Sequence, residues 1–211
     1  MKKNKGVFIT LEGIEGAGKS THMEYIADLL KSSGRKIVCT REPGGTYIGN
    51  ELRNLLLFRD TGYQISDQTE LLLMFAARQQ HLDEVIRPAL TAGKIVLCDR
   101  FTDSTYAYQG GGRKIKSEII KQLAKVVHPD LNPDLTLLFD LPVKLGLERA
   151  NNRSEKDRFE SEETVFFERV RKIYLEIAKA EPRRVKIINA KKDIETVQSS
   201  IMTILKSKKL C

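Results

Sequence analysis

The chain has 211 residues, of which 41% are hydrophobic and 30% are charged, and its formal net charge at pH 7 is +8. Such a chain is long enough to fold as one domain with a sizeable core, and its composition excludes wholesale disorder. No apolar run approaches the roughly 20 residues of a membrane span, and Glu12 interrupts the apolar stretch that follows the N-terminal lysines, which argues against a signal peptide. We therefore expect a cytoplasmic protein with no membrane partner, in which Cys39, Cys98 and Cys211 are reduced thiols.

The positive charge is concentrated near the C-terminus. Residues 183–211 hold eight basic and two acidic side chains, a net charge of +6, which leaves +2 for the preceding residues. A basic balance suits anionic partners such as nucleic acid or phosphorylated small molecules, although a solvated terminal helix is the simpler interpretation. The segment lacks the interleaved aromatic side chains that stack on bases, so we expect no nucleic-acid partner.

Five short runs of apolar or β-branched residues predict strands that are covered on both faces. In chain order they occupy residues 7–11, 37–40, 95–98, 135–139 and 185–188. Between them, apolar residues at helical spacing predict amphipathic helices. These residues are Met23, Ile26, Ala27 and Leu30 before a stop at Gly34, then Ile48, Leu52, Leu55 and Leu56, and then Ile119, Leu123, Val126 and Val127 before His128-Pro129. The alternation predicts an α/β fold in a single domain over 1–211, a five-stranded parallel sheet flanked by helices with ligands beyond the carboxyl ends of its strands.

A glycine-rich loop follows the first predicted strand and precedes a helix. It matches the pattern G-x-x-x-x-G-K-[ST] and comprises Gly13, Ile14, Glu15, Gly16, Ala17, Gly18, Lys19, Ser20 and Thr21. In such a phosphate loop the backbone N–H groups and the helix N-terminus converge on phosphate oxygens. Lys19 can then bridge the β and γ phosphates, and the Ser20 hydroxyl can ligate Mg²⁺. The motif predicts a nucleoside triphosphate site without naming the reaction.

Polar residues follow the next two strands as well. Thr40-Arg41-Glu42-Pro43-Gly44-Gly45 forms a loop after the second strand, and Asp99 ends the third, where a carboxylate that organises Mg²⁺ belongs. The segment 102–110 then combines hydroxyls, an amide and aromatic rings, which together can hydrogen-bond a base edge and stack on its face.

These segments together resemble the thymidylate kinases. The phosphate loop, Arg-Glu-Pro-Gly-Gly, the Asp99–Gln109 segment and Pro-Asp-Leu-Thr-Leu at 133–137 occur in the family's order and spacing, and the resemblance runs from about residue 6 to 205. It implies the P-loop fold of nucleoside-monophosphate kinases with a mobile lid. It also implies Mg²⁺-dependent transfer of the ATP γ-phosphoryl group to dTMP, giving dTDP, by a homodimer. The apolar surface of the predicted 67–88 helix suits such a dimer.

The resemblance also implies roles for individual residues. On the acceptor side, Glu42 is expected beside the deoxyribose and phosphate. Arg53 and Arg100 are expected on that phosphate, Arg78 near the base, and Tyr108 against the sugar. The acceptor site is expected to be completed by Ser104, Thr105 and Gln109. On the ATP side, Arg149 is expected to stack on adenine near Asn189 and Ala190. The expected catalytic set is Lys19, Asp99, Arg100, Arg153 and Glu15, with Ser20 and Asp99 at the metal.

The polar run at 149–159 is compatible on composition alone with a solvated loop. Its position implies a lid at about 150–160, because nucleoside-monophosphate kinases close such a segment on ATP and exclude water. The phosphate loop has no arginine, so the chain resembles the bacterial type in which the lid supplies it. We expect Arg153 to reach the transferring phosphate, with Arg158 as the alternative.

One position departs from the family pattern. A phenylalanine often stands four residues before the arginine at 78, whereas this chain has Met74 there and Phe75 next to it. Either Phe75 stacks on the base or Met74 covers it, and core packing is the alternative for Phe75. The histidines, His22, His81 and His128, have no metal-binding spacing and are expected to be structural.

Two other functions stay open from the sequence. The first is a kinase of the same fold acting on another monophosphate or on a nucleoside, because an apolar pocket discriminates a single methyl group by only about 1–3 kcal/mol. The second is a non-catalytic protein that binds nucleotides or nucleic acid.

Overall fold

The computed structural model describes residues 6–57, 64–151, 158–160 and 162–211. Within these residues, five parallel strands form one sheet in the order β2-β3-β1-β4-β5, which confirms the predicted architecture. The strands are β1 (Val7–Glu12), β2 (Ile37–Arg41), β3 (Ile95–Asp99), β4 (Leu135–Asp140) and β5 (Val185–Asn189). Each ends one residue later than predicted, on a polar side chain, because backbone pairing continues beyond the last apolar residue. Leu11 pairs with Asp99, for example, and Asp140 with Asn189.

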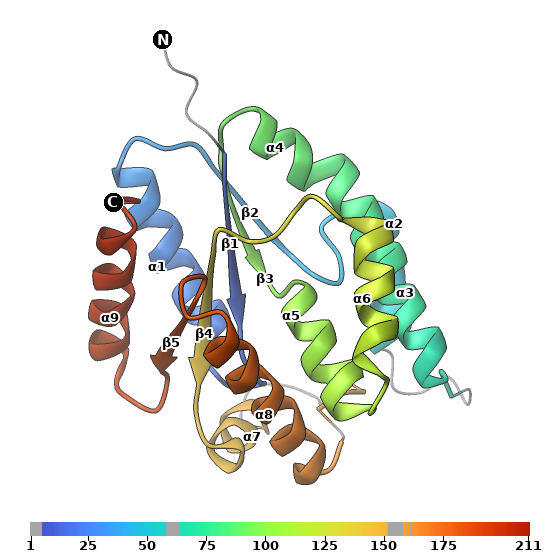
Figure 1. Ribbon diagram of the computed structural model, residues 1–211. Coiled ribbons are helices and arrows are strands. Elements are labelled where there is room, and N and C mark those ends of the chain that lie inside the picture. Colours follow the sequence, from blue (N-terminus) through green and yellow to red (C-terminus); the bar gives the residue numbers. More distant parts are fainter. Residues whose placement is uncertain (1–5, 58–63, 152–157, 161) are drawn as a thin grey trace.

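Helices cover both faces of the sheet (Figure 1). They are α1 (Lys19–Ser32), α2 (Tyr47–Leu57), α3 (Asp67–His81), α4 (Arg87–Thr91), α5 (Thr102–Thr105), α6 (Ser117–Val127), α7 (Val143–Asn151), α8 (Thr164–Ala180) and α9 (Ile194–Ser207), with π-helical turns η1 (Leu82–Ile86) and η2 (Tyr106–Gly112). Helices α1 and α9 contact each other on one face, and α3, α4 and α6 lie on the other (Figure 1). The predicted 67–88 helix is thus continued through η1 into α4, to Thr91.

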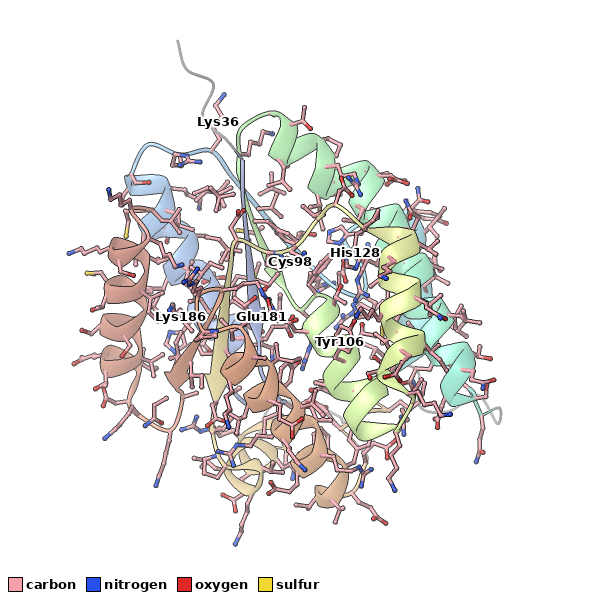
Figure 2. All side chains as sticks on the ribbon, viewed as in Figure 1. Lys36, Cys98, Tyr106, His128, Glu181 and Lys186 are labelled. Atoms are coloured by element: carbon pink, nitrogen blue, oxygen red, sulfur yellow. The ribbon has the colours of Figure 1, made fainter. Side chains whose placement is uncertain are left out.

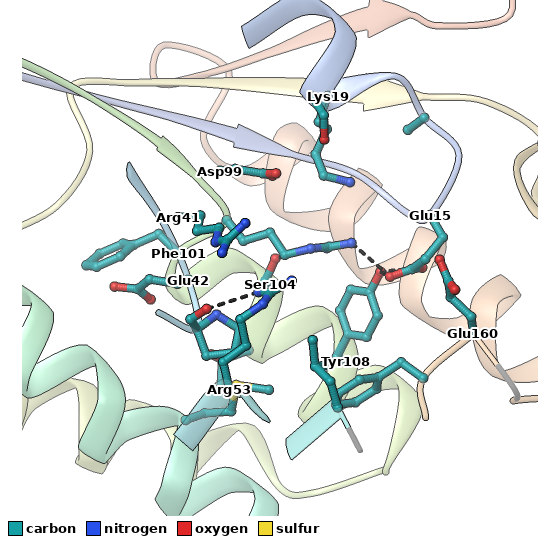
Figure 3. A pocket seen from close by; sticks show the side chains of 18 of the residues that line it. Glu15, Lys19, Arg41, Glu42, Arg53, Asp99, Phe101, Ser104, Tyr108 and Glu160 are labelled. Carbon is teal, nitrogen blue, oxygen red and sulfur yellow. Dashed lines mark hydrogen bonds and ion pairs between the residues drawn. The ribbon is translucent and has the colours of Figure 1, made fainter. Parts of the chain in front are cut away.

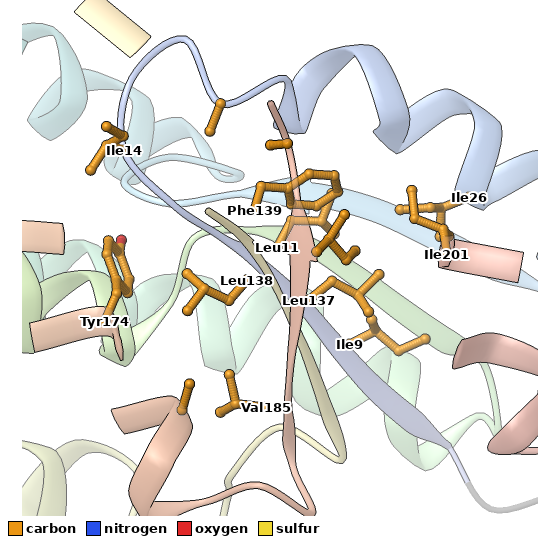
Figure 4. Close-up of a cluster of buried hydrophobic side chains, with 14 of the residues drawn as sticks. Ile9, Leu11, Ile14, Ile26, Leu137, Leu138, Phe139, Tyr174, Val185 and Ile201 are labelled. Atoms are coloured by element: carbon orange, nitrogen blue, oxygen red, sulfur yellow. The ribbon is translucent and has the colours of Figure 1, made fainter. Parts of the chain in front are cut away.

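The core lies on both faces of the central strands. Ile9 and Leu11 of β1 contact the layer of α1 and α9, where Ile26 and Ile201 are fully buried (Figure 4). Phe8, on the alternate face, belongs to a second apolar cluster with side chains of η1 and β3. The edge strands differ from prediction: β2 is only partly covered and Ile187 of β5 is 52% exposed, because each edge strand has a single neighbour.

Two helices bury only part of the apolar face that was predicted. In α6, Ile120 is buried whereas Ile119 and Val126 are exposed. In α2, Leu56 is buried but Ile48 and Leu55 are about half exposed. Apolar spacing identified both helices correctly, yet it could not say which apolar residues face the neighbouring element.

The strand order places one crevice at the middle of the sheet. β1 lies between β3 and β4, and the chain passes from β3 to β4 across it, so the connections diverge at the carboxyl end of β1. Ligands bind at such switch points in parallel α/β sheets. Among the described residues, no helix has the length and apolar character to cross a membrane.

Candidate active site

The phosphate loop follows β1 and is folded tightly against β4 and α7. Gly13 and Gly16 have φ values of 139° and 67°, in the left-handed region that favours glycine. A side-chain Cβ at Gly13 would overlap the carbonyl of Phe139, and one at Gly16 would overlap the carbonyl of Gly146. The loop conformation therefore requires glycine at both positions.

Lys19, at the start of α1, closes this loop over the crevice. Its buried Nζ donates to the carbonyl oxygens of Gly13 (2.8 Å) and Ile14 (3.0 Å). Burial, with a smaller contribution from Arg100, lowers the pKa of Lys19 from 10.5 to about 8, although nearby carboxylates such as Asp99 oppose the shift. A phosphate group beside Nζ would supply the negative charge that a buried ammonium lacks.

Arg100 is held over the crevice by several partners. Its backbone N–H donates to the carbonyl of Leu11 in β1, and its φ of 69° is rare for a residue with a side chain. The guanidinium donates to Glu15 Oε1 (2.8 Å) and lies 4.8 Å from the centre of the Tyr108 ring. Tyr108 also donates to Glu15 at 2.7 Å. Three predicted site residues thus form one cluster in the lining of the cavity, and Figure 3 labels two of them, Glu15 and Tyr108.

Glu12 is a buried carboxylate beneath this cluster, and the sequence did not reveal its role. It accepts hydrogen bonds from the Phe101 N–H (2.8 Å), Ser104 Oγ (2.6 Å) and Tyr174 Oη (3.0 Å). Burial, reinforced by Asp103, raises the pKa of Glu12 from 4.5 to about 7. A charged residue at the end of an otherwise apolar strand was the available signal.

Glu42 anchors a second cluster at the end of β2. It accepts from Arg78 Nε (2.7 Å) and contacts His81 Nδ1 (3.0 Å), whose other ring nitrogen contacts Thr40 Oγ1 (2.6 Å). Burial alone would raise the pKa of Glu42, but Arg78 and His81 outweigh it and lower that pKa. Arg78 also donates to Thr105 Oγ1 (2.9 Å). These contacts hold Arg78 in the lining of the cavity.

The histidines have partners that the sequence did not show. His81 supports Glu42, as described above. His128 lies at the end of α6 (Figure 2). It contacts Thr102 Oγ1 (2.8 Å) and the carbonyl of Leu131 (3.1 Å). The ring of His22 stacks on Phe139, with 5.6 Å between the ring centres.

One cavity brings together most of the predicted site residues (Figure 3). Those that line it are Glu15, Gly16, Ala17, Gly18, Lys19, Ser20, Glu42, Arg53, Arg78, Asp99, Arg100, Ser104, Thr105, Tyr108 and Gln109. Leu57, Met74 and Phe159 add an apolar wall that the sequence did not predict as such, and Glu160 lies beside it.

Phe75 is not on this cavity. Its ring is 3% exposed and packs with Leu71 and Ile120 between α3 and α6. Met74, one position earlier, lines the cavity instead. Successive residues of a helix point about 100° apart, and here Met74 faces the cavity while Phe75 faces α6. Phe75 instead contacts a residue of the cavity lining, since its ring centre lies 4.8 Å from the guanidinium carbon of Arg78.

The residues that were predicted to bind adenine lie together outside this cavity. Arg149, at the end of α7, donates to the carbonyl of Ala190 (2.8 Å), directly after Asn189 at the end of β5. Arg149 and Ala190 are therefore in direct contact, and their role toward adenine stays a prediction.

The two candidate lid arginines differ in what can be said of them. Arg153 lies outside the described residues. Arg158 donates to Glu70 Oε2 (2.6 Å) and to the carbonyl of Leu56 (2.8 Å), and it does not line the cavity. In this conformation Arg158 anchors the segment to α2 and α3.

The predicted metal residues fit a hard cation. Ser20 and Asp99 line the same cavity beside Lys19. Asp99 Oδ1 is buried and has no hydrogen-bond partner among the described residues, so it is available to a ligand. Mg²⁺ is commonly held by one or two protein oxygens together with substrate phosphates and water.

Comparisons with known proteins agree with this geometry. The family model of thymidylate kinase matches residues 11–201. A thymidylate kinase of Pseudomonas savastanoi pv. phaseolicola is 55% identical over 200 residues, and one of Pseudomonas syringae pv. tomato is 56% identical over 201, each covering 95% of both chains. The crystal structure of thymidylate kinase from Ehrlichia chaffeensis matches with a TM-score of 0.78 and 35% identity, covering 95% of this chain and 99% of that one. The chain belongs to the thymidylate kinase family.

Proposed function

We propose that this protein phosphorylates dTMP to dTDP by in-line transfer of the γ-phosphoryl group of ATP. The observation that carries the proposal is the single cavity in which the phosphate loop and Lys19 lie opposite Arg53 and Arg78, in a chain of the thymidylate kinase family. Two polyanions must meet there. Positioning and charge neutralisation supply most of the rate in phosphoryl transfer, and arginines provide both.

On the donor side, the phosphate loop would bind the ATP phosphates through its backbone N–H groups. Lys19 would leave the carbonyls of Gly13 and Ile14 for the β and γ phosphates. Ser20 and Asp99 would hold the Mg²⁺ that accompanies ATP, which neutralises charge on those phosphates. Arg149 would stack on adenine.

On the acceptor side, Arg53 and Arg100 would bind the dTMP phosphate, next to Glu42. The base would lie along the apolar wall, covered by Met74, with Arg78 and Gln109 at its polar edge. Met74 suits this place because a thioether is polarisable and adapts to a flat ring. Ser104, Thr105 and Tyr108 would complete the contacts to the sugar and base.

Arg153 of the lid would reach the transferring phosphate, because the phosphate loop carries Glu15 and no arginine. Glu15 would set the position of Arg100 and Tyr108, as its hydrogen bonds indicate. An arginine that stabilises the transferring group contributes about 1,000-fold or more to the rate.

The test measures ADP formation from ATP–Mg²⁺ with dTMP, dUMP, dGMP, CMP and thymidine as separate acceptors. We expect strong turnover with dTMP, and a loss of about 1,000-fold in kcat for Arg153→Ala. Arg183→Ala, which removes an exposed arginine remote from the cavity, is the matched control and should keep full activity. Preference for another acceptor would show that dTMP is not the substrate. Absence of turnover with every acceptor would refute the proposal that the protein is an enzyme.

We also propose that the enzyme is a cytoplasmic homodimer. Helices α2 and α3 contact each other and expose four large apolar side chains, namely Tyr47, Ile48, Leu55 and Leu72. Neighbouring exposed apolar groups favour a protein interface. Light scattering should give twice the chain mass, and Leu72→Glu should shift it to that of one chain, whereas Val165→Glu on α8 should not. The free cysteines, with Cys39 and Cys211 exposed, suit a reducing compartment.

A further inference from the structure

The side-chain amide of Gln109 has a fixed orientation at the cavity. Gln109, in η2, lines the cavity but is only 1% exposed. Its Nε2 donates to Glu70 Oε1 across 2.7 Å. Glu70 lies in the first turn of α3 and is fully buried.

The chemistry of the two groups determines which way the amide points. An ionised carboxylate only accepts hydrogen bonds, so the nitrogen of the amide must face Glu70. The reverse orientation would place two oxygens against each other. The hydrogen bonds among the described residues include none to Gln109 Oε1, and Gln109 lines the cavity, so this oxygen can accept a hydrogen bond from whatever occupies the cavity.

Two arginines pair with Glu70. Arg158 Nη2 lies 2.6 Å from Glu70 Oε2, and Arg113 Nη2 lies 3.2 Å from the same oxygen. Buried charges persist when they are paired in this way. Arg113 also contacts Asp67, which is half exposed and does not touch Gln109.

We propose that Glu70 is a positioning residue that sets base specificity by holding the Gln109 oxygen toward the acceptor base. An acceptor at this place favours a base whose ring nitrogen carries a hydrogen, as N3 does in thymine and uracil. It disfavours cytosine, whose N3 is itself an acceptor. The proposal rests on the proposed function, and it adds a residue that does not line the cavity.

The test compares base discrimination rather than activity alone. For each variant, kcat/KM is measured with dTMP and dUMP, and dCMP is measured as an inhibitor of dTMP turnover, so that a value is obtained without its phosphorylation. Glu70→Gln can present either end of its amide to Gln109, which frees the orientation. Glu70→Asp keeps the charge opposite the two arginines but withdraws it from Gln109, and it serves where Glu70→Gln does not fold.

We expect either variant to reduce the preference for dTMP over dCMP by about tenfold or more, because a misplaced buried partner leaves a polar group unsatisfied. In a Gln109→Ala background, Glu70→Gln should leave that preference unchanged, because Glu70 acts through Gln109. Asp67→Asn, which removes a carboxylate from the same helix and the same arginine, should keep the preference of the unaltered protein.

Equal losses for all nucleotides, with the preference retained, would overturn the proposal and leave Glu70 a purely structural role. A measurement on the unaltered protein serves as a second check. The analogue 3-methyl-dTMP, which lacks the ring N–H, should bind at least about tenfold more weakly than dTMP. Equal binding of the two nucleotides would also overturn the proposal. If the unaltered protein does not turn over dTMP, it is the proposed function that fails.

Discussion

Replacing Glu12 by glutamine should change how the stability of the protein depends on pH. Glu12 is fully buried and accepts hydrogen bonds from the Phe101 N–H, Ser104 and Tyr174. Its pKa is raised to about 7, chiefly by burial. Glutamine has the same shape, keeps a carbonyl oxygen for the Phe101 N–H, and can donate to hydroxyls that are able to accept. The variant therefore mimics the protonated carboxyl.

The sign and size follow from the two pKa values of Glu12. Below pH 4.5 the carboxyl is protonated in both the folded and the unfolded chain, and it contributes no pH dependence. Between pH 4.5 and about 7 the unfolded chain releases the proton while the folded chain retains it, so stability falls as the pH rises. At about 1.4 kcal/mol per pH unit, the loss reaches about 3 kcal/mol above pH 7.

The assay is denaturant unfolding of the ligand-free protein and of Glu12→Gln over a series of pH values. The difference in the free energy of unfolding, variant minus unaltered protein, should increase by about 3 kcal/mol from pH 4.5 to above pH 7. Other titrating groups are common to both proteins and cancel in this difference. Parallel curves for the two proteins would refute the reasoning, because they would show that Glu12 titrates alike in the folded and unfolded chains.

Three further predictions concern the cavity and the phosphate loop. Met74→Ala should raise KM for dTMP about tenfold with little loss of stability, whereas Phe75→Ala should lower the free energy of unfolding by about 3–5 kcal/mol; dTMP kinetics and denaturant unfolding separate the two. Lys19→Met should abolish turnover yet raise the melting temperature of the ligand-free protein near neutral pH, since it removes a cation whose pKa burial lowers to about 8; a lower melting temperature would contradict this. Gly16→Ala should abolish ATP binding in a calorimetric titration, because its Cβ would overlap the Gly146 carbonyl; retained affinity would show that the loop can relax.

The sheet and the phosphate loop could be predicted because their signals are local. A strand in a parallel sheet is a short apolar run, and the loop is a contiguous motif. The predictions were incomplete, or left alternatives open, where the deciding neighbour is remote in sequence. In α6, Ile120 rather than Ile119 is buried against α3, and in α3, Met74 rather than Phe75 faces the cavity. The rotation of each helix about its own axis is set by the elements it packs against.

The same reason explains the residues that the sequence did not reveal. Glu12 and Tyr174 are hydrogen-bonded across 162 positions, and Glu70 and Arg158 across 88. A lone glutamate in an apolar strand or at a helix start has no recognisable pattern of its own. Its role becomes visible once the fold brings its partner to it.

Three buried carboxylates share one structural role. Glu12, Glu42 and Glu70 are each 5% exposed or less, and each hydrogen-bonds a residue that lines the cavity: Ser104, Arg78 and Gln109 respectively. A cavity lined with cations and amides for two phosphorylated substrates would be repulsive and poorly ordered without ligand. Carboxylates placed behind these groups fix each of them before substrate arrives, which lowers the reorganisation that binding and phosphoryl transfer require.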